Sequence, residues 1–176
     1  MLNRPRLAAL AAGVLLTAGI GATVPASAAP PQSAPPQSAA PAIPLVTNAR
    51  WGGHGSFDRI VIDVRGTLPP VTVTPVKVLR YDGSGQKVPL AGKYFLEIKL
   101  SPAAAHDDAG KSVYNGPRLT KVWLPTLKGL ALTGDYEAAV TFGAAFDTKP
   151  AYKILRLHAP ERIVVDVRPS AVGCGV

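Results

Sequence analysis

Residues 58–65 read DRIVIDVR and alternate aliphatic with polar side chains. In an extended chain, successive side chains point to opposite faces, so Ile60, Ile62 and Val64 share one face. The arginines and the second aspartate share the other face. This period of two is typical of a strand that has one face on a core and the other toward solvent.

Residues 161–168 read ERIVVDVR and repeat the same design near the end of the chain. We predict that the two stretches form neighbouring strands whose apolar faces fill one core, with Val165 inward and Val164 outward in solvent. Each stretch carries an arginine and an aspartate four residues apart, too distant to pair within one strand. Opposite charges on neighbouring strands stabilise a sheet by about 0.2–1 kcal/mol per pair. The alternative is that these polar faces are simply solvated.

Similar alternation marks the chain between the two stretches. The candidate strands are residues 71–74, 76–81, 94–100, 121–124, 130–133, 136–142 and 152–158. Pro75 indicates an edge strand or a bulge, and residues 82–85 (DGSG) a turn. Residues 102–109 form either a short helix or an irregular loop. Period-two runs between Gly, Pro and Asp signals indicate an all-β sandwich or barrel. We expect a single antiparallel β-sandwich of roughly eight strands.

The N-terminus resembles a secretory signal. Residues 1–6 are basic, residues 7–24 are uncharged and mostly apolar, and residues 25–28 read PASA, a small-residue cleavage pattern. We therefore expect a signal peptide over residues 1–28, cleaved after Ala28. The alternative is an uncleaved membrane anchor, against which the glycines and Pro25 argue. The protein is accordingly expected to be secreted or extracellular, and possibly associated with the cell wall.

Composition divides the rest of the chain into three parts. Residues 29–45 are rich in Pro, Ala, Gln and Ser, which predicts a disordered linker that favours extended polyproline II. The alternative is a proline-rich ligand for a recognition domain. Residues 46–169 have the composition of one globular domain, and residues 170–176 form a tail. The single cysteine, Cys174, lies in that tail, so it is either idle or bonded to another chain.

The charge balance narrows the class of partner. The whole chain has a formal charge of +8, and removal of Arg4 and Arg6 with the signal leaves 17 basic and 11 acidic residues, or +6. No run of five basic residues occurs, so we do not expect nucleic-acid binding. A basic surface outside the cell is attracted to anionic wall polymers or lipid headgroups.

Several segments together resemble the AMIN-like domain family. They are the two strand motifs at 57–64 and 160–167 and the segments 82–92, 100–107 and 132–137. The resemblance covers about residues 47–169. It implies a β-sandwich of exported bacterial proteins and a non-catalytic module that associates with the cell envelope by contacting peptidoglycan. No amidase or secretin domain follows Pro169 here, which departs from the arrangement of AMIN domains proper.

The residues do not indicate catalysis. His54, His106 and His158 lie far apart without metal-ligand spacing, and no nucleophile-elbow motif occurs. The one weak alternative is a divalent ion at His106 and the two aspartates that follow it. We expect no enzyme activity, no cofactor and no metal.

Aromatic and cationic residues in polar surroundings are the candidate ligand-binding residues. They are Trp51, His54, Arg59, Tyr114, Arg118 and Arg162. The Trp51 ring, beside a glycine-rich loop, either stacks on a ligand or packs on the core. The loop at 114–118 is expected to be exposed, as a binding loop or an ordinary turn.

The sequence thus predicts a secreted, non-catalytic envelope module that binds peptidoglycan or an anionic wall polymer. One alternative is a protein–protein module that uses edge-strand pairing or a Cys174-linked dimer. A third is an unrecognised hydrolase.

Overall fold

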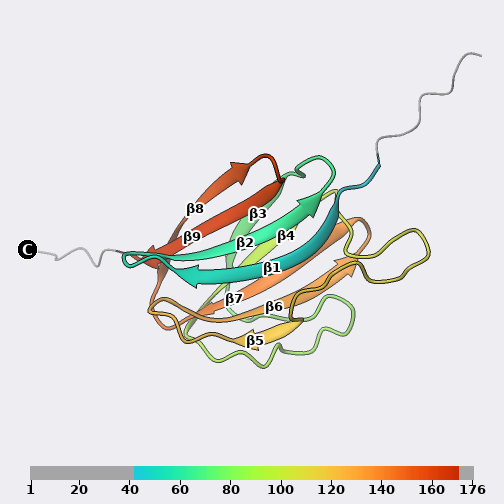
Figure 1. The fold of residues 1–176 in the computed structure, drawn as a ribbon. Coiled ribbons are helices and arrows are strands. Elements are labelled where there is room, and N and C mark those ends of the chain that lie inside the picture. The colour runs from blue at the N-terminus through green and yellow to red at the C-terminus, as the bar shows by residue number, and fades with distance from the viewer. Residues whose placement is uncertain (1–41, 171–176) are drawn as a thin grey trace, which may run out of the picture. The chain divides into compact units, whose positions relative to one another are not determined.

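The computed structural model of the protein describes residues 42–170, which form two layers of antiparallel strands without a helix in this range (Figure 1). The predicted signal peptide, nearly all of the linker and Cys174 lie outside the described residues. The strands are β1 (Leu45–Gly53), β2 (Asp58–Arg65), β3 (Val71–Val76), β4 (Tyr94–Leu100), β5 (Leu119–Lys121), β6 (Leu127–Tyr136), β7 (Ala139–Phe146), β8 (Pro150–Leu157) and β9 (Arg162–Pro169). The predicted all-β sandwich is confirmed.

The four-stranded sheet has the order β1-β2-β9-β8. The two repeated stretches, β2 and β9, are antiparallel neighbours, and Ile62 lies opposite Ile163. Their alternate residues, including Ile60 and Val165, are fully buried. The prediction that the two stretches lie side by side over one core is therefore confirmed.

The five-stranded sheet has the order β3-β4-β7-β6-β5. The inward residues of β4, such as Leu96 and Ile98, are buried with Phe142 and Phe146 of β7 between the two sheets. Pro75 lies in β3 at the edge of this sheet, where its missing N–H removes no essential ladder bond.

The outer face of the five-stranded sheet is covered by residues 77–92. Leu79, Val88 and Leu90 from this segment form a second buried cluster with Ala131 and Ala145. The sheet has glycines under the cover: a Cβ on Gly129 would lie 2.6 Å from a methyl carbon of Leu90, and one on Gly143 would lie 2.8 Å from Leu79. This sheet is therefore buried on both faces in its middle.

Four local predictions differ from the structure. The predicted strand 121–124 is a loop apart from Lys121, the last residue of β5. Trp51 and the two glycines after it belong to β1 rather than to a loop. The predicted strand 76–81 is mostly irregular, because the chain leaves β3 at Val76 to cover the sheet. The predicted strand 136–142 contains a tight turn at Glu137 and Ala138, which have φ values of 49° and 53°. Glycine or asparagine normally marks such a turn, so the sequence did not signal it.

Two side chains link the sheets. The buried carboxylate of Asp58 accepts hydrogen bonds from the backbone N–H groups of Thr126 and Leu127, at 2.7 and 2.8 Å. The hydroxyl of Tyr152 in β8 donates to the carbonyl oxygen of Val73 in β3, at 2.9 Å. Residues 102–109 form an irregular loop, the second of the two predicted alternatives.

Candidate ligand-binding face

No described segment forms a buried apolar cluster on the outer face of the four-stranded sheet. Residues of β1, β2, β8 and β9 that point outward lie in register across it, as Arg59, Asp166 and Lys153 do. We call this surface the arginine face. Its charged residues are Arg50, Arg59, Arg65, Lys153, Arg162 and Arg168, with the two carboxylates Asp63 and Asp166.

The central ion pair of the arginine face joins the two repeated strands. Nε and Nη2 of Arg59 donate to the two carboxylate oxygens of Asp166 at 2.6 and 2.8 Å. This hydrogen bond to Asp166 raises the pKa of Arg59. The pair realises the predicted cross-strand pairing, and its two-point geometry fixes the orientation of both side chains.

The second pair forms with a different arginine from the one the repeat suggests. Asp63 lies opposite Arg162, but it accepts instead from Arg50 of β1, at 3.1 and 2.9 Å. The Nε of Arg162 donates to the carbonyl oxygen of Pro160. Because Arg50 is half exposed, this pair contributes little to stability. Within residues 42–170, the cations of the arginine face that form no ion pair are Arg65, Lys153, Arg162 and Arg168.

The centre of the arginine face is apolar. Val61 and Val164 lie opposite each other and point outward, yet only 8% and 1% of their surfaces are exposed. The prediction that Val164 meets solvent is therefore wrong. Arg50, Arg59 and Arg162 surround these valines, and the aliphatic part of an arginine covers apolar surface while its guanidinium stays in water.

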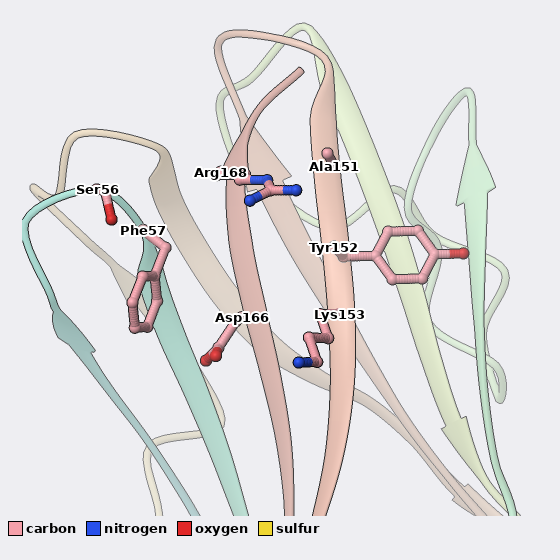
Figure 2. A pocket seen from close by; sticks show the side chains of 7 residues that line it. All are labelled: Ser56, Phe57, Ala151, Tyr152, Lys153, Asp166 and Arg168. Atoms are coloured by element: carbon pink, nitrogen blue, oxygen red, sulfur yellow. The ribbon is translucent and has the colours of Figure 1, made fainter. Parts of the chain in front are cut away.

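Two shallow depressions flank the central ion pair. The first, of about 280 Å³, is lined by Ser56, Phe57, Ala151, Tyr152, Lys153, Asp166 and Arg168. Figure 2 shows Phe57 on one side, Lys153 and Arg168 on the other, and Asp166 between them, while Tyr152 points away toward β3. The depression thus offers two cations and one aromatic ring.

The second depression, of about 270 Å³, brings together four of the residues singled out from the sequence. Its lining consists of Arg50, Trp51, Gly52, His54, Arg59, Val61, Leu157, Arg162 and Val164. Each depression is small compared with pockets that hold drug-sized ligands, which occupy about 300–1,000 Å³. Each has room for one sugar ring or one acidic group of a larger polymer.

Phe57 connects the two depressions and was not singled out from the sequence. The His54 ring stacks on it with the centroids 5.1 Å apart and the planes 9° apart. The Arg59 guanidinium lies 5.2 Å from the Phe57 ring centroid. Phe57 therefore orients His54 and Arg59 by stacking and a cation–π contact. An aromatic residue two positions before an outward arginine was the only available signal.

Of the two alternatives stated for Trp51, the structure shows packing on the core, and of the expected exposed residues in the loop 114–118 it buries Tyr114. Trp51 is half-buried and packs on the core cluster, while Trp123 is 91% exposed. Tyr114 is only 8% exposed, so its expected exposure is wrong. Burial raises the pKa of Tyr114 to about 12, although the nearby charge of Arg118 lowers it. Arg118 is exposed, donates to the Ser112 hydroxyl, and lies outside the arginine face.

The loop proposed for a divalent ion makes other contacts. Nδ1 of His106 lies 2.8 Å from a carboxylate oxygen of Asp135. Asp107 accepts from the backbone N–H groups of Ala109 and Lys111. Between residues 42 and 170 there is no group of three histidine, cysteine or acidic side chains arranged to hold a metal. In the same range, no helix has the length and apolarity to span a bilayer.

The described residues form a β-sandwich module whose four-stranded sheet carries a basic outer face. The model of the AMIN-like domain matches residues 44–169, and the chain belongs to this family. Neither the curated proteins nor the solved structures contain a match. AMIN-like domains are generally non-catalytic binding modules that occur in cell-envelope proteins, so the chain is a cell-envelope-associated module.

Proposed function

We propose that the protein is a secreted, non-catalytic module that holds peptidoglycan or an anionic wall polymer against the arginine face. The observation that carries this proposal is the charge of that face, where six cations meet two carboxylates on a sheet surface without an apolar cover. The two carboxylates are already paired with Arg50 and Arg59. The remaining cations are therefore free to attract an acidic ligand.

Arginine suits such a ligand for a geometric reason. Its planar guanidinium donates two parallel hydrogen bonds to a carboxylate or a phosphate, the acidic groups of wall polymers. Arg162 and Arg168 lie on the same face of β9, six residues apart, which spans about 20 Å in an extended strand. That span favours a long polymer with repeated acidic groups over a single small molecule.

The aromatic residues add contacts that do not depend on charge. His54 and Phe57 present stacked rings between the two depressions. Trp51 also borders the second depression, but its position opposite Ile60 places its side chain on the core face of β1. A sugar of the polymer would lie against these rings while an acidic substituent meets Arg162.

Edge-strand pairing with another protein is less well supported. β3 carries Pro75, and β8 carries Lys153 and Arg156, which are residues that protect sheet edges from pairing. Tyr152 also joins β8 to β3 and closes that side of the sandwich. The Cys174-linked dimer depends on a residue outside the described range.

Sedimentation with purified cell walls tests the proposal. The triple variant Lys153→Gln/Arg162→Gln/Arg168→Gln removes three unpaired cations of the arginine face. The control Lys87→Gln/Lys99→Gln/Lys111→Gln removes three exposed lysines elsewhere and changes the net charge equally. We expect the first variant to lose at least about tenfold in wall affinity, since each charged contact contributes about 0.5–1 kcal/mol or more. We expect the control to retain most of its affinity.

Two outcomes contradict the proposal. Equal losses in the two variants would mean that net charge, and not the arginine face, governs retention. Release of soluble wall fragments by the unaltered protein would indicate a hydrolase.

A further inference from the structure

Trp123 is the most exposed large apolar side chain among the described residues, with 91% of its surface in solvent. It lies in the loop between β5 and β6, two strands of the five-stranded sheet, whereas the arginine face belongs to the four-stranded sheet. Tryptophan has the largest apolar surface of any side chain, and such exposure is uncommon unless the residue meets a partner.

The loop that carries Trp123 is firmly held. The buried Asp58 carboxylate accepts from two successive N–H groups on the C-terminal side of the loop. The Nζ of Lys128 donates to the carbonyl oxygen of Leu124 at 2.8 Å, and Leu124 itself packs on the core. The backbone N–H of Val122 donates to the carbonyl oxygen of Lys128. The fold therefore holds the backbone that carries the indole, so little backbone ordering entropy is lost when it binds.

Lysines lie at the same end of the sandwich as this loop. The β1–β2 hairpin and the β5–β6 loop lie at one end of the sandwich, as Figure 1 shows, and Asp58 joins them. The β7–β8 connection reaches the same end, because the Nζ of Lys128 lies 3.8 Å from a carboxylate oxygen of Asp147. The residues before β4 reach it too, because the backbone N–H of Lys93 donates to the carbonyl oxygen of Phe146. Over residues 53–57, 91–94, 121–128 and 147–149, the charged residues are Lys93, Lys121, Lys128, Lys149 and Asp147.

We propose that this end of the sandwich docks on a bilayer surface that contains anionic phospholipid, with the Trp123 indole in the headgroup layer. Tryptophan prefers this interface because its ring is apolar and its N–H still finds a hydrogen-bond partner. Lysines at the rim are attracted to the negative surface. The β1–β2 hairpin at this end also carries His54 and Phe57 of the two depressions, but Trp123 and the four lysines do not belong to the arginine face, so the inference does not depend on the proposed function.

A projecting indole suits a bilayer better than a glycan. Because only 9% of the Trp123 surface is covered, the ring stands out from the molecule and does not line a groove. A sugar bound to it would contact one ring face and few of the donors and acceptors that sugar hydroxyls need. A soft, continuous surface can instead accept a convex tip together with the lysines around it.

Vesicle sedimentation with the secreted chain tests this inference. We expect binding to vesicles of phosphatidylglycerol and phosphatidylcholine and little binding to phosphatidylcholine alone, since each lysine near an anionic surface contributes about a fivefold gain. Trp123→Ala should weaken partitioning by about tenfold or more. The control is Tyr136→Ala, which removes an aromatic side chain that is 70% exposed at the opposite end of β6.

A spectroscopic measurement follows Trp123 directly. Trp51→Phe leaves Trp123 as the sole tryptophan of the chain. Its fluorescence emission should shift to shorter wavelength when anionic vesicles are added, because the indole leaves water. The shift should be absent with phosphatidylcholine vesicles.

Three results would overturn the inference. The first is no binding to anionic vesicles, and the second is equal vesicle binding by Trp123→Ala and the unaltered protein. The third is a Trp123→Ala variant that loses retention on lipid-free walls while it keeps its vesicle binding, which would make Trp123 a glycan contact. Failure of the wall-binding proposal would appear separately, in the triple variant of the arginine face.

Discussion

Asp58 shows at the scale of one residue how a polar group organises this sandwich. It is 1% exposed, and its carboxylate satisfies two backbone N–H groups of the β5–β6 loop that are themselves buried. The carboxylate links residues that are far apart in the chain. This contact is one of several that hold the loop carrying Trp123, together with the hydrogen bonds of Lys128 and the packing of Leu124.

Removal of the Asp58 carboxylate should strongly destabilise the fold. Asp58→Ala leaves two buried N–H groups without acceptors, and each costs about 1–3 kcal/mol. We expect a loss of about 3 kcal/mol in the free energy of unfolding, measured by urea denaturation. Asp58→Asn keeps one acceptor oxygen and should lose less. If Asp58→Ala were as stable as the unaltered protein, the carboxylate would not hold the loop.

The raised pKa of Tyr114 implies that the stability of the fold falls at high pH. Burial raises its pKa to about 12, above the ordinary value of 10 that it has in the unfolded chain. The neutral phenol therefore contributes stability that is fully present below pH 10 and is lost as the pH rises toward 12.

The size of this effect follows from the shift. Two pKa units correspond to about 2–3 kcal/mol. Unfolding followed by urea between pH 9 and 12 should show a steeper fall in the unaltered protein than in Tyr114→Phe, which has no proton to lose. Parallel pH profiles would mean that the pKa of Tyr114 in the folded protein is not higher than its pKa in the unfolded chain.

At the scale of elements, β9 combines a buried inner face with an outer face that is also largely buried at its centre. Val165 points into the core and is fully buried, while Val164 points outward and is 1% exposed. The alternation of the strand predicts the directions of these side chains correctly. It does not predict the arginines of β1 and β2 that shield Val164.

Truncation of either valine should therefore destabilise the protein. Val164→Ala and Val165→Ala each remove buried methyl groups and leave a cavity, at a cost of about 1–3 kcal/mol. Chemical denaturation should give losses of similar size for the two variants. A loss below about 0.5 kcal/mol for Val164→Ala would show that water reaches the centre of the arginine face.

At the scale of the whole molecule, charge is divided between surfaces. The arginine face and the end that carries Trp123 are basic, whereas the other end is mixed: Lys111 and Arg118 lie there with five acidic residues, in the loops near His106 and the β6–β7 turn. The acidic residues are Asp82, Asp107, Asp108, Asp135 and Glu137. An acidic envelope surface would thus attract the molecule in a preferred orientation.

Salt should separate the two proposed interactions. The reach of surface charges shortens from about 10 Å at 0.1 M salt to about 3 Å at 1 M. We expect wall retention, which depends on exposed cations, to fall steeply over this range. Vesicle binding should keep a residual part that disappears only with Trp123→Ala, because burial of an indole is not screened. Equal salt dependence of both interactions would contradict this division.

Local sequence patterns determined the all-β class, the inward faces of β2, β4 and β9, and the pairing of the two repeated strands. They also placed Arg59 and Arg162 on one exposed face. These features follow from the two-residue period of a strand, which is visible in a few consecutive residues. The resemblance to AMIN-like domains rests on the same local motifs.

Tertiary structure alone decided which sheet face remains uncovered, because residues 77–92 pack on the five-stranded sheet through contacts far apart in the chain. It also decided that Trp51 packs on the core and that Trp123 projects into solvent. Trp51 follows Arg50 and precedes glycine, whereas Trp123 lies between Val122 and Leu124, so the local sequence would favour burial of the tryptophan that is in fact exposed. Exposure depends on what distant segments cover, and the period of a strand carries no information about that.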